Sequence, residues 1–241
     1  MTQSSLGHWG DIDARIVAAL KPSAAPIGIT FNGNVDVPSL GRPMAPANGN
    51  GRTGAVPAGC VFWMMSTDRA FSTNAEDHAN CSVGSYTHGL ITAETAARRD
   101  DVGAILEAGW VDEKSFLGLP RLGFLPARID YGPLWSATKP DVILLRINGL
   151  ALMTLKDAFL DLAIEGKPQC HIIPLAFNEQ RPVASTGCAL SRARTGMRSE
   201  EMTCALPAAR ADELLERLEA TVQLNRTMAR YAAEDARRWP V

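Results

Sequence analysis

The sequence has almost no excess of charge of either sign. Its 24 Lys and Arg residues nearly balance 26 Asp and Glu residues, and these charges are spread along the chain. Such a chain creates no field that would attract nucleic acid or an anionic membrane surface. We therefore expect no nucleic-acid partner.

Long apolar runs are also missing. No stretch approaches the roughly 18 apolar residues of a membrane span, and the first residues lack a basic region followed by an apolar one. We expect no membrane partner and a cytoplasmic location. With 241 residues, 46% of them hydrophobic, the chain can bury a substantial core. A single globular domain over 1–241 is the expectation.

Common catalytic motifs are missing as well. The chain contains no G-x-S-x-G, no P-loop, no H-E-x-x-H and no G-x-G-x-x-G after a predicted strand. These absences argue against the usual hydrolase, nucleotide-binding and zinc-peptidase interpretations. Nor does the chain have the tight C-x2-C pairs of zinc ribbons and ferredoxins.

Apolar periodicity predicts both strands and helices. Strands are predicted over 26–31, 125–131, 141–147 and 202–206, with 141–147 in the centre of the sheet. Helices are predicted over 11–20, 81–91, 94–109, 150–164 and 208–237. The fold class is therefore α/β or α+β: a mixed sheet flanked by helices, with a long C-terminal helix.

Two further segments have a less regular pattern. Residues 60–65 are too apolar for the surface, and we expect them to be buried as either a helix or a strand. Residues 32–59 are rich in Gly, Pro and Asn and show no periodicity. They are predicted to form a long loop or a lid.

Four of the five cysteines form two similarly spaced pairs. The pairs are Cys60 with Cys81, 21 positions apart, and Cys170 with Cys188, 18 positions apart. The second cysteine of each pair opens a segment with a glycine at its eighth following position, Gly89 or Gly196. This repetition suggests two similar half-sites of one centre.

Four soft thiolates that converge on one point would hold a zinc ion or an iron–sulfur cluster. The alternative is a set of buried structural thiols, because free cysteine is among the most buried residue types. A disulfide framework is not expected in a reducing cytoplasm. Cys81 is predicted near the start of a helix, where unpaired amides stabilise a thiolate. Cys204, in a predicted strand, is expected to be a core residue.

Three segments carry a resemblance to a known family: EDHANCSVG (76–84), YGPL (131–134) and TGCALSR (186–192). From Pro26 to about Pro207 the chain resembles the prokaryotic domain-of-unknown-function 169 family. In that family, cysteines recur at positions that match the four named above, and a histidine precedes the second by three residues, matching His78. The resemblance implies a site at these cysteines and leaves the reaction open. His88 and the segment 32–59 are local departures.

Two polar residues near the cysteines are candidates for catalysis. His78 lies three residues before Cys81 and could donate a proton, although a hydrogen-bonded structural histidine is an equal alternative. Arg192 lies four residues after Cys188 and could anchor an anionic substrate. Arg194 and Arg198 belong to the same basic cluster, and Glu200 and Glu201 lie close enough in sequence to neutralise these arginines instead.

We therefore predict a cytoplasmic iron–sulfur protein. Its 4Fe-4S cluster would be held by Cys60, Cys81, Cys170 and Cys188, and the protein would act as a lyase or redox enzyme. The expected partner is a small anionic substrate or a redox partner, and the sequence indicates no oligomeric state. The alternatives are a non-catalytic zinc protein and a small-molecule-binding module with a reactive thiol.

Overall fold

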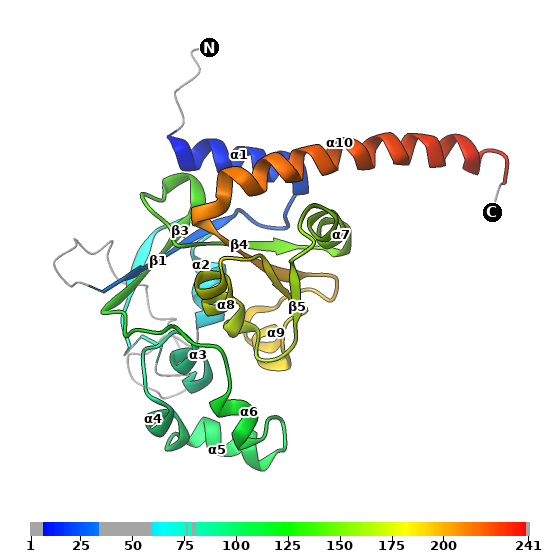
Figure 1. Ribbon diagram of the computed structural model, residues 1–241. Helices are drawn as coiled ribbons and strands as arrows, with labels where there is room; N and C mark the ends of the chain where they lie inside the picture. The colour runs from blue at the N-terminus through cyan, green and yellow to red at the C-terminus, as the bar shows by residue number, and fades with distance from the viewer. Residues whose placement is uncertain (1–6, 34–58, 76, 79–80, 240–241) are drawn as a thin grey trace.

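The computed structural model describes residues 7–33, 59–75, 77–78 and 81–239. Its centre is a seven-stranded sheet with the order β2-β3-β1-β4-β7-β6-β5 (Figure 1). The strands are β1 (Ile27–Asn32), β2 (Phe71–Thr73), β3 (Arg128–Pro133), β4 (Val142–Ile147), β5 (Ala163–Glu165), β6 (Val183–Ser185) and β7 (Met202–Pro207). Neighbouring strands are antiparallel except for the parallel pair β5–β6. The predicted mixed sheet is confirmed, with β4 in its centre.

Strand alternation divides the core into two clusters, one on each face of the sheet. In β4, Leu144 pairs with Ala205 of β7, and both belong to the first cluster. The next pair, Leu145 with Cys204, belongs to the second cluster. Because successive side chains of a strand point to opposite faces, the central strands serve both clusters. Cys60 packs in the first cluster, on the opposite face from Cys204.

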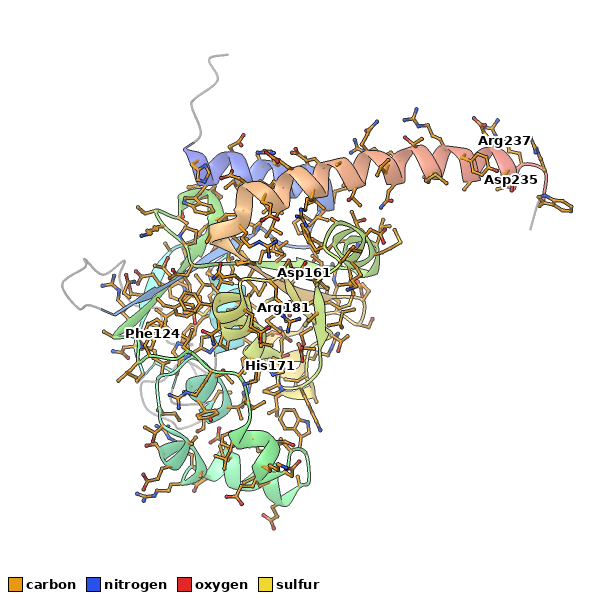
Figure 2. The ribbon with its side chains drawn as sticks, in the orientation of Figure 1. Phe124, Asp161, His171, Arg181, Asp235 and Arg237 are labelled. Carbon is orange, nitrogen blue, oxygen red and sulfur yellow. The ribbon has the colours of Figure 1, made fainter. Side chains whose placement is uncertain are left out.

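Three long helices cover the face that contains Cys204. They are α1 (His8–Leu20), α7 (Gly149–Ala158) and α10 (Ala211–Ala236), which follows the short η3 (Ala208–Arg210). Figure 1 shows α1 and α10 side by side, with the second half of α10 extending beyond the sheet. Asp235 and Arg237 lie at that far end (Figure 2). The predicted long C-terminal helix is confirmed.

The other face of the sheet carries shorter helices. α2 (Gly59–Met65) and α8 (Ile172–Glu179) pack on the sheet through the first cluster, and α9 (Ala189–Thr195) packs beside α2. The short helices α3 (Ser82–Thr87), α4 (Ala93–Ala97), α5 (Asp100–Glu107) and α6 (Glu113–Leu117) share a small core of their own, at the bottom of Figure 1. Residues 60–65 are therefore helical.

Three predicted helices were too long. The helix predicted over 81–91 corresponds to α3, which ends at Thr87. The helix predicted over 94–109 is split because Arg99 adopts an extended conformation. Asp100 then begins α5, and its carboxylate interacts favourably with the positive end of the helix dipole. The helix predicted over 150–164 ends at Ala158. Its apolar spacing continues only because Phe159 and Leu162, beyond its end, still pack into the same core. The predicted loop or lid over 32–59 lies almost wholly outside the described residues.

Candidate four-cysteine site

All four paired cysteines line one open pocket with an empty volume of about 400 Å³. Cys60 is buried, and Cys81, Cys170 and Cys188 are half-buried. The rest of the lining consists of Gly59, Val83, Gly84, Trp110, Pro168, Gln169, Leu190, Ser191 and Arg194. Segments that are distant in sequence thus meet at one place. All five cysteines are free thiols, as expected from the sequence.

Each of the four cysteines stands at the beginning of a helical segment. Cys60 is the second residue of α2, and Cys170 lies in η2 (Gln169–His171), which leads directly into α8. Cys81 and Cys188 are the residues that cap the amino ends of α3 and α9. The helical starts therefore determine where the thiols lie.

The two cysteine segments recognised in the sequence have similar backbones. Each begins with a helix-capping cysteine, and each ends with a glycine of positive φ, +73° at Gly89 and +63° at Gly196. Only glycine adopts this conformation without strain. At Gly89 an added Cβ would also lie 2.5 Å from the carbonyl oxygen of Phe124.

Local hydrogen bonds hold these two helix starts. The Ser191 amide donates to the Cys188 sulfur at 3.4 Å, and the Cys188 amide donates to the Ser191 hydroxyl at 3.4 Å, which completes a capping box. At α3 the corresponding group is Asp101 of α5, which accepts from the Ser82 amide at 2.9 Å and from its hydroxyl at 2.6 Å. Cys188 and Ser191 thus form a capping signal that the sequence already contained.

Burial and mutual proximity keep two of the thiols protonated. Burial, with a contribution from the nearby Cys81, raises the pKa of Cys60 to about 12. Burial and the same neighbour raise the pKa of Cys170 well above its ordinary value, although a hydrogen bond with Thr87 opposes this. Since a metal binds thiolates, ligation at these two residues must release protons.

Arg194 is the arginine of the pocket. Its side chain is hydrogen-bonded to Cys81 and lies within electrostatic range of Cys60 and Asp101. Burial lowers the pKa of Arg194, but the interactions with Cys81 more than offset this effect, so the pKa is raised. The pocket therefore contains one permanent positive charge beside its sulfur atoms.

Arg192, the predicted anchor for an anion, is placed elsewhere. Its guanidinium donates to the carbonyl oxygens of Arg198 at 2.7 Å, Thr186 at 2.6 Å and Glu201 at 2.8 Å. It is not part of the pocket lining, and both of its terminal nitrogens donate to backbone carbonyls around α9. Arg192 thus holds the segment together and Arg194 faces the thiols, and the role of Arg192 as an anchor for an anion stays a prediction.

His78 is buried close to the pocket but does not line it. The imidazole is fully buried, its Nε2 is 3.1 Å from the Thr73 hydroxyl, and a Cβ added at Gly59 would lie 3.5 Å from its Nδ1. Burial, and secondarily His88, lower the pKa of His78 well below its usual range. His78 is therefore a neutral imidazole that packs against Gly59, the residue before Cys60. Its role as a proton donor stays a prediction.

Tyr131 of the YGPL motif is a close neighbour of the thiols. Its side chain is 1% exposed, and its hydroxyl has no hydrogen-bond partner among the described residues. Burial, followed by the proximity of Cys170 and Cys60, raises the pKa of Tyr131. The YGPL motif contained this residue, but a motif alone does not say which way a strand residue points.

The thiols share a pocket without crowding around a single point. Among the described residues, no group of three or more His, Cys, Asp or Glu side chains is arranged to hold a metal ion. Likewise, no helix in the described ranges is both long and apolar enough to cross a membrane.

Comparison with known proteins identifies one family. The model of the DUF169 family, described as an uncharacterised ArCR family, matches residues 15–217 and so includes every residue of the four-cysteine pocket. Neither the curated proteins nor the solved structures contain a significant match.

Proposed function

This chain belongs to the domain-of-unknown-function 169 family, and we propose that it is a cytoplasmic iron–sulfur protein. Its cluster, 4Fe-4S in our proposal, would be held by Cys60, Cys81, Cys170 and Cys188. The observation that carries this proposal is that these four cysteines, from four separate helical starts, line one pocket as free thiols. The fifth, Cys204, is buried on the opposite face of the sheet.

The chemistry of the pocket fits such a group. Its possible ligands are sulfur atoms, and none of the described residues contributes a carboxylate or an imidazole to the lining. Soft thiolates select zinc, copper(I) and iron–sulfur clusters over hard cations. Apolar side chains such as Val83, Trp110 and Leu190 surround the sulfurs, and Arg194 offsets part of their negative charge. Burial and nearby charge are the means by which proteins adjust a cluster's potential.

The residues around the pocket support two kinds of activity. The protein could catalyse a reaction of a small anionic substrate, or it could transfer electrons to or from a redox partner. A bound cluster supplies one-electron transfer when all four cysteines are ligands, and an open iron site when only three are. Arg194 is exposed enough to meet an anion and is fixed beside Cys81. It therefore takes over the anchoring role that the sequence suggested for Arg192.

A second candidate function rests on the contact between Arg194 and Cys81. An arginine hydrogen-bonded to a half-buried cysteine is also what a reactive thiol in a small-molecule-binding module needs. In that case no metal is bound, and Cys81 reacts faster than the other thiols. A structural zinc ion, held by the same four cysteines, is the third outcome.

Anaerobic purification followed by metal and sulfide analysis separates the three possibilities. The proposal predicts a brown protein with broad absorption near about 400 nm and with iron and acid-labile sulfide in similar amounts. A colourless protein with stoichiometric zinc would support the structural site. A colourless, metal-free protein in which iodoacetamide labels Cys81 first would support the binding module.

A further inference from the structure

The second half of α10, which projects beyond the sheet, carries an apolar stripe in solvent (Figure 1). The buried residues of α10 end at Leu218, and every residue over 226–239 is exposed. Leu224, Met228 and Tyr231 are 66%, 60% and 66% exposed. Because residues at i, i+4 and i+7 lie on one side of a helix, these three form the apolar stripe. Such a stripe normally packs against another surface.

The same half of α10 has a second apolar face, which consists of small side chains. This alanine face contains Ala229, Ala232, Ala233 and Ala236. At about 100° per residue, it lies roughly a third of a turn from the apolar stripe. Small side chains allow two helices to approach each other closely. The projecting helix therefore has two faces that suit packing, one flat and one with large side chains.

A groove opens at the base of the projecting half, in the corner between α10, the start of α7 and the end of α1. Its free volume is about 410 Å³, far more than the ~30 Å³ share of one water. The α7 wall includes Leu150 and Met153, which are 69% and 47% exposed. The α10 wall includes Val222 and, from the alanine face, Ala229. The groove thus offers two apolar walls to an entering helix.

The apolar stripe cannot fill the groove of its own molecule. Val222 and Ala229 line the groove from one side of α10, and the stripe faces more than a third of a turn away from them. α10 is one continuous helix from Ala211 to Ala236, so its end does not fold back. The occupant must be a second molecule, with one face for each wall. The projecting half of another copy of this chain meets that requirement.

We propose that two copies of this chain pair through their projecting helices about a two-fold axis. The helices are antiparallel in this pair, and their alanine faces are in contact. The apolar stripe of each helix lies on Leu150 and Met153 of the other copy. Because each copy supplies one helix and one groove, the symmetry is closed. Anchors at i, i+4 and i+7 are typical of a helix bound in a groove. This interface lies on the opposite face of the sheet from Cys60.

Charge complementarity favours this pairing. The groove lining contains the cations Lys21 and Arg226, and none of the described residues contributes a carboxylate to it. Asp235 follows Tyr231 by four positions, so it continues the apolar stripe to the far end of α10, where Figure 2 labels it. Arg237, two positions further along, leaves the helix on nearly the opposite side. The end of an entering helix therefore brings a carboxylate to the cations of the groove.

Sedimentation equilibrium of the purified full chain tests the pairing. The wild type is expected to have a mass near twice the 25.9 kDa of one chain. Met228→Glu in the stripe and Leu150→Glu in the groove should each raise the dimer dissociation constant about tenfold or more, because each buries an unpaired carboxylate. The matched control is Leu160→Glu, since Leu160 is 85% exposed and does not line the groove.

Three results of this experiment would overturn the proposal. The first is a wild type that stays monomeric at about 100 µM, where a stable dimer would form. The second is a dimer that either Met228→Glu or Leu150→Glu leaves intact, because the pairing uses both surfaces. The third is equal weakening by the control Leu160→Glu.

An exchange of charges tests how the helix enters the groove. Lys21→Glu alone and Asp235→Lys alone should each weaken the dimer roughly fivefold, because each places like charges together. The double variant should recover most of the wild-type affinity, since it restores a pair of opposite charges in reversed order. A double variant weaker than both single variants would contradict the entry of the helix end into the groove.

A membrane surface is the other common partner of an exposed apolar stripe. Asp235 makes it the less suitable one, because its carboxylate would meet the apolar lipid chains. Flotation of the wild type with phosphatidylglycerol vesicles distinguishes the two partners. Dimerisation without flotation is the expected result. A monomer that floats with the vesicles, and that Met228→Glu releases from them, would overturn the proposal and assign the stripe to lipid.

Discussion

The buried carboxylate of Glu201 allows a quantitative test of how much its hydrogen bonds and ion pair stabilise the fold. The residue is 1% exposed, and its carboxylate accepts from the Arg198 amide at 2.9 Å and from Arg146 at 2.6 Å. Burial alone would raise its pKa, but these bonds and one from Ser23 outweigh burial and lower the pKa to about 2. Glu201→Gln removes the charge and retains the approximate shape.

The magnitude follows from the difference between the folded and unfolded pKa values. A fall from 4.5 to about 2 corresponds to about 3 kcal/mol of stability near neutral pH. Because folding lowers the pKa, this stabilisation is complete above about pH 5 and is lost as the pH falls toward about 2. About 1 kcal/mol should therefore remain at pH 3.

Urea unfolding of the wild type and Glu201→Gln at pH 7 and pH 3 measures this effect. The difference in unfolding free energy between the two proteins should shrink by about 2 kcal/mol at the lower pH. Glu200→Gln is the control, because Glu200 is 56% exposed and its ion pair with Arg198 is worth at most about 1 kcal/mol. A pH-independent difference for Glu201→Gln would refute the reasoning.

Two further predictions concern the cysteine segments. Gly89→Ala should lower the unfolding free energy by more than about 2 kcal/mol, because it adds a steric clash to backbone strain. Gly196→Ala should lower it by about 1 kcal/mol from backbone strain alone. Gly103→Ala, in open space on α5, should not lower it. Chemical denaturation measures all three, and a similar cost at each position would contradict the assigned conformations. Arg192→Lys should cost about 1–3 kcal/mol through lost bonds to carbonyl groups, whereas the exposed Arg194→Lys should cost less than about 0.5 kcal/mol. The reverse order would exchange their roles.

Much of the sheet could be predicted from the sequence because its central strands have clear apolar patterns. In β1, Ile27, Ile29 and Phe31 all face one cluster, and the run in β4 serves both faces. The short strands β5 and β6 have three residues each, too few to establish a period. Their parallel pairing depends on contacts between distant segments, which no local pattern records.

The arginines show why the site was harder to predict than the fold. Arg192 and Arg194 are two positions apart in α9, so their side chains leave the helix in nearly opposite directions. The sequence placed both near Cys188, but only the three-dimensional arrangement shows which one faces the pocket. The gathering of the cysteines at one pocket could be anticipated from their repeated segments.

The most direct test of the central claim is the iron and sulfide content of single cysteine variants purified without oxygen. Replacement of Cys60, Cys81, Cys170 or Cys188 by Ser should each reduce both contents well below the wild-type level, since all four line the pocket. Cys204→Ser, at a fully buried position on the opposite face, should keep the wild-type content in the folded protein. Loss of iron and sulfide in all five variants, or in none of them, would contradict a cluster held by the four pocket cysteines.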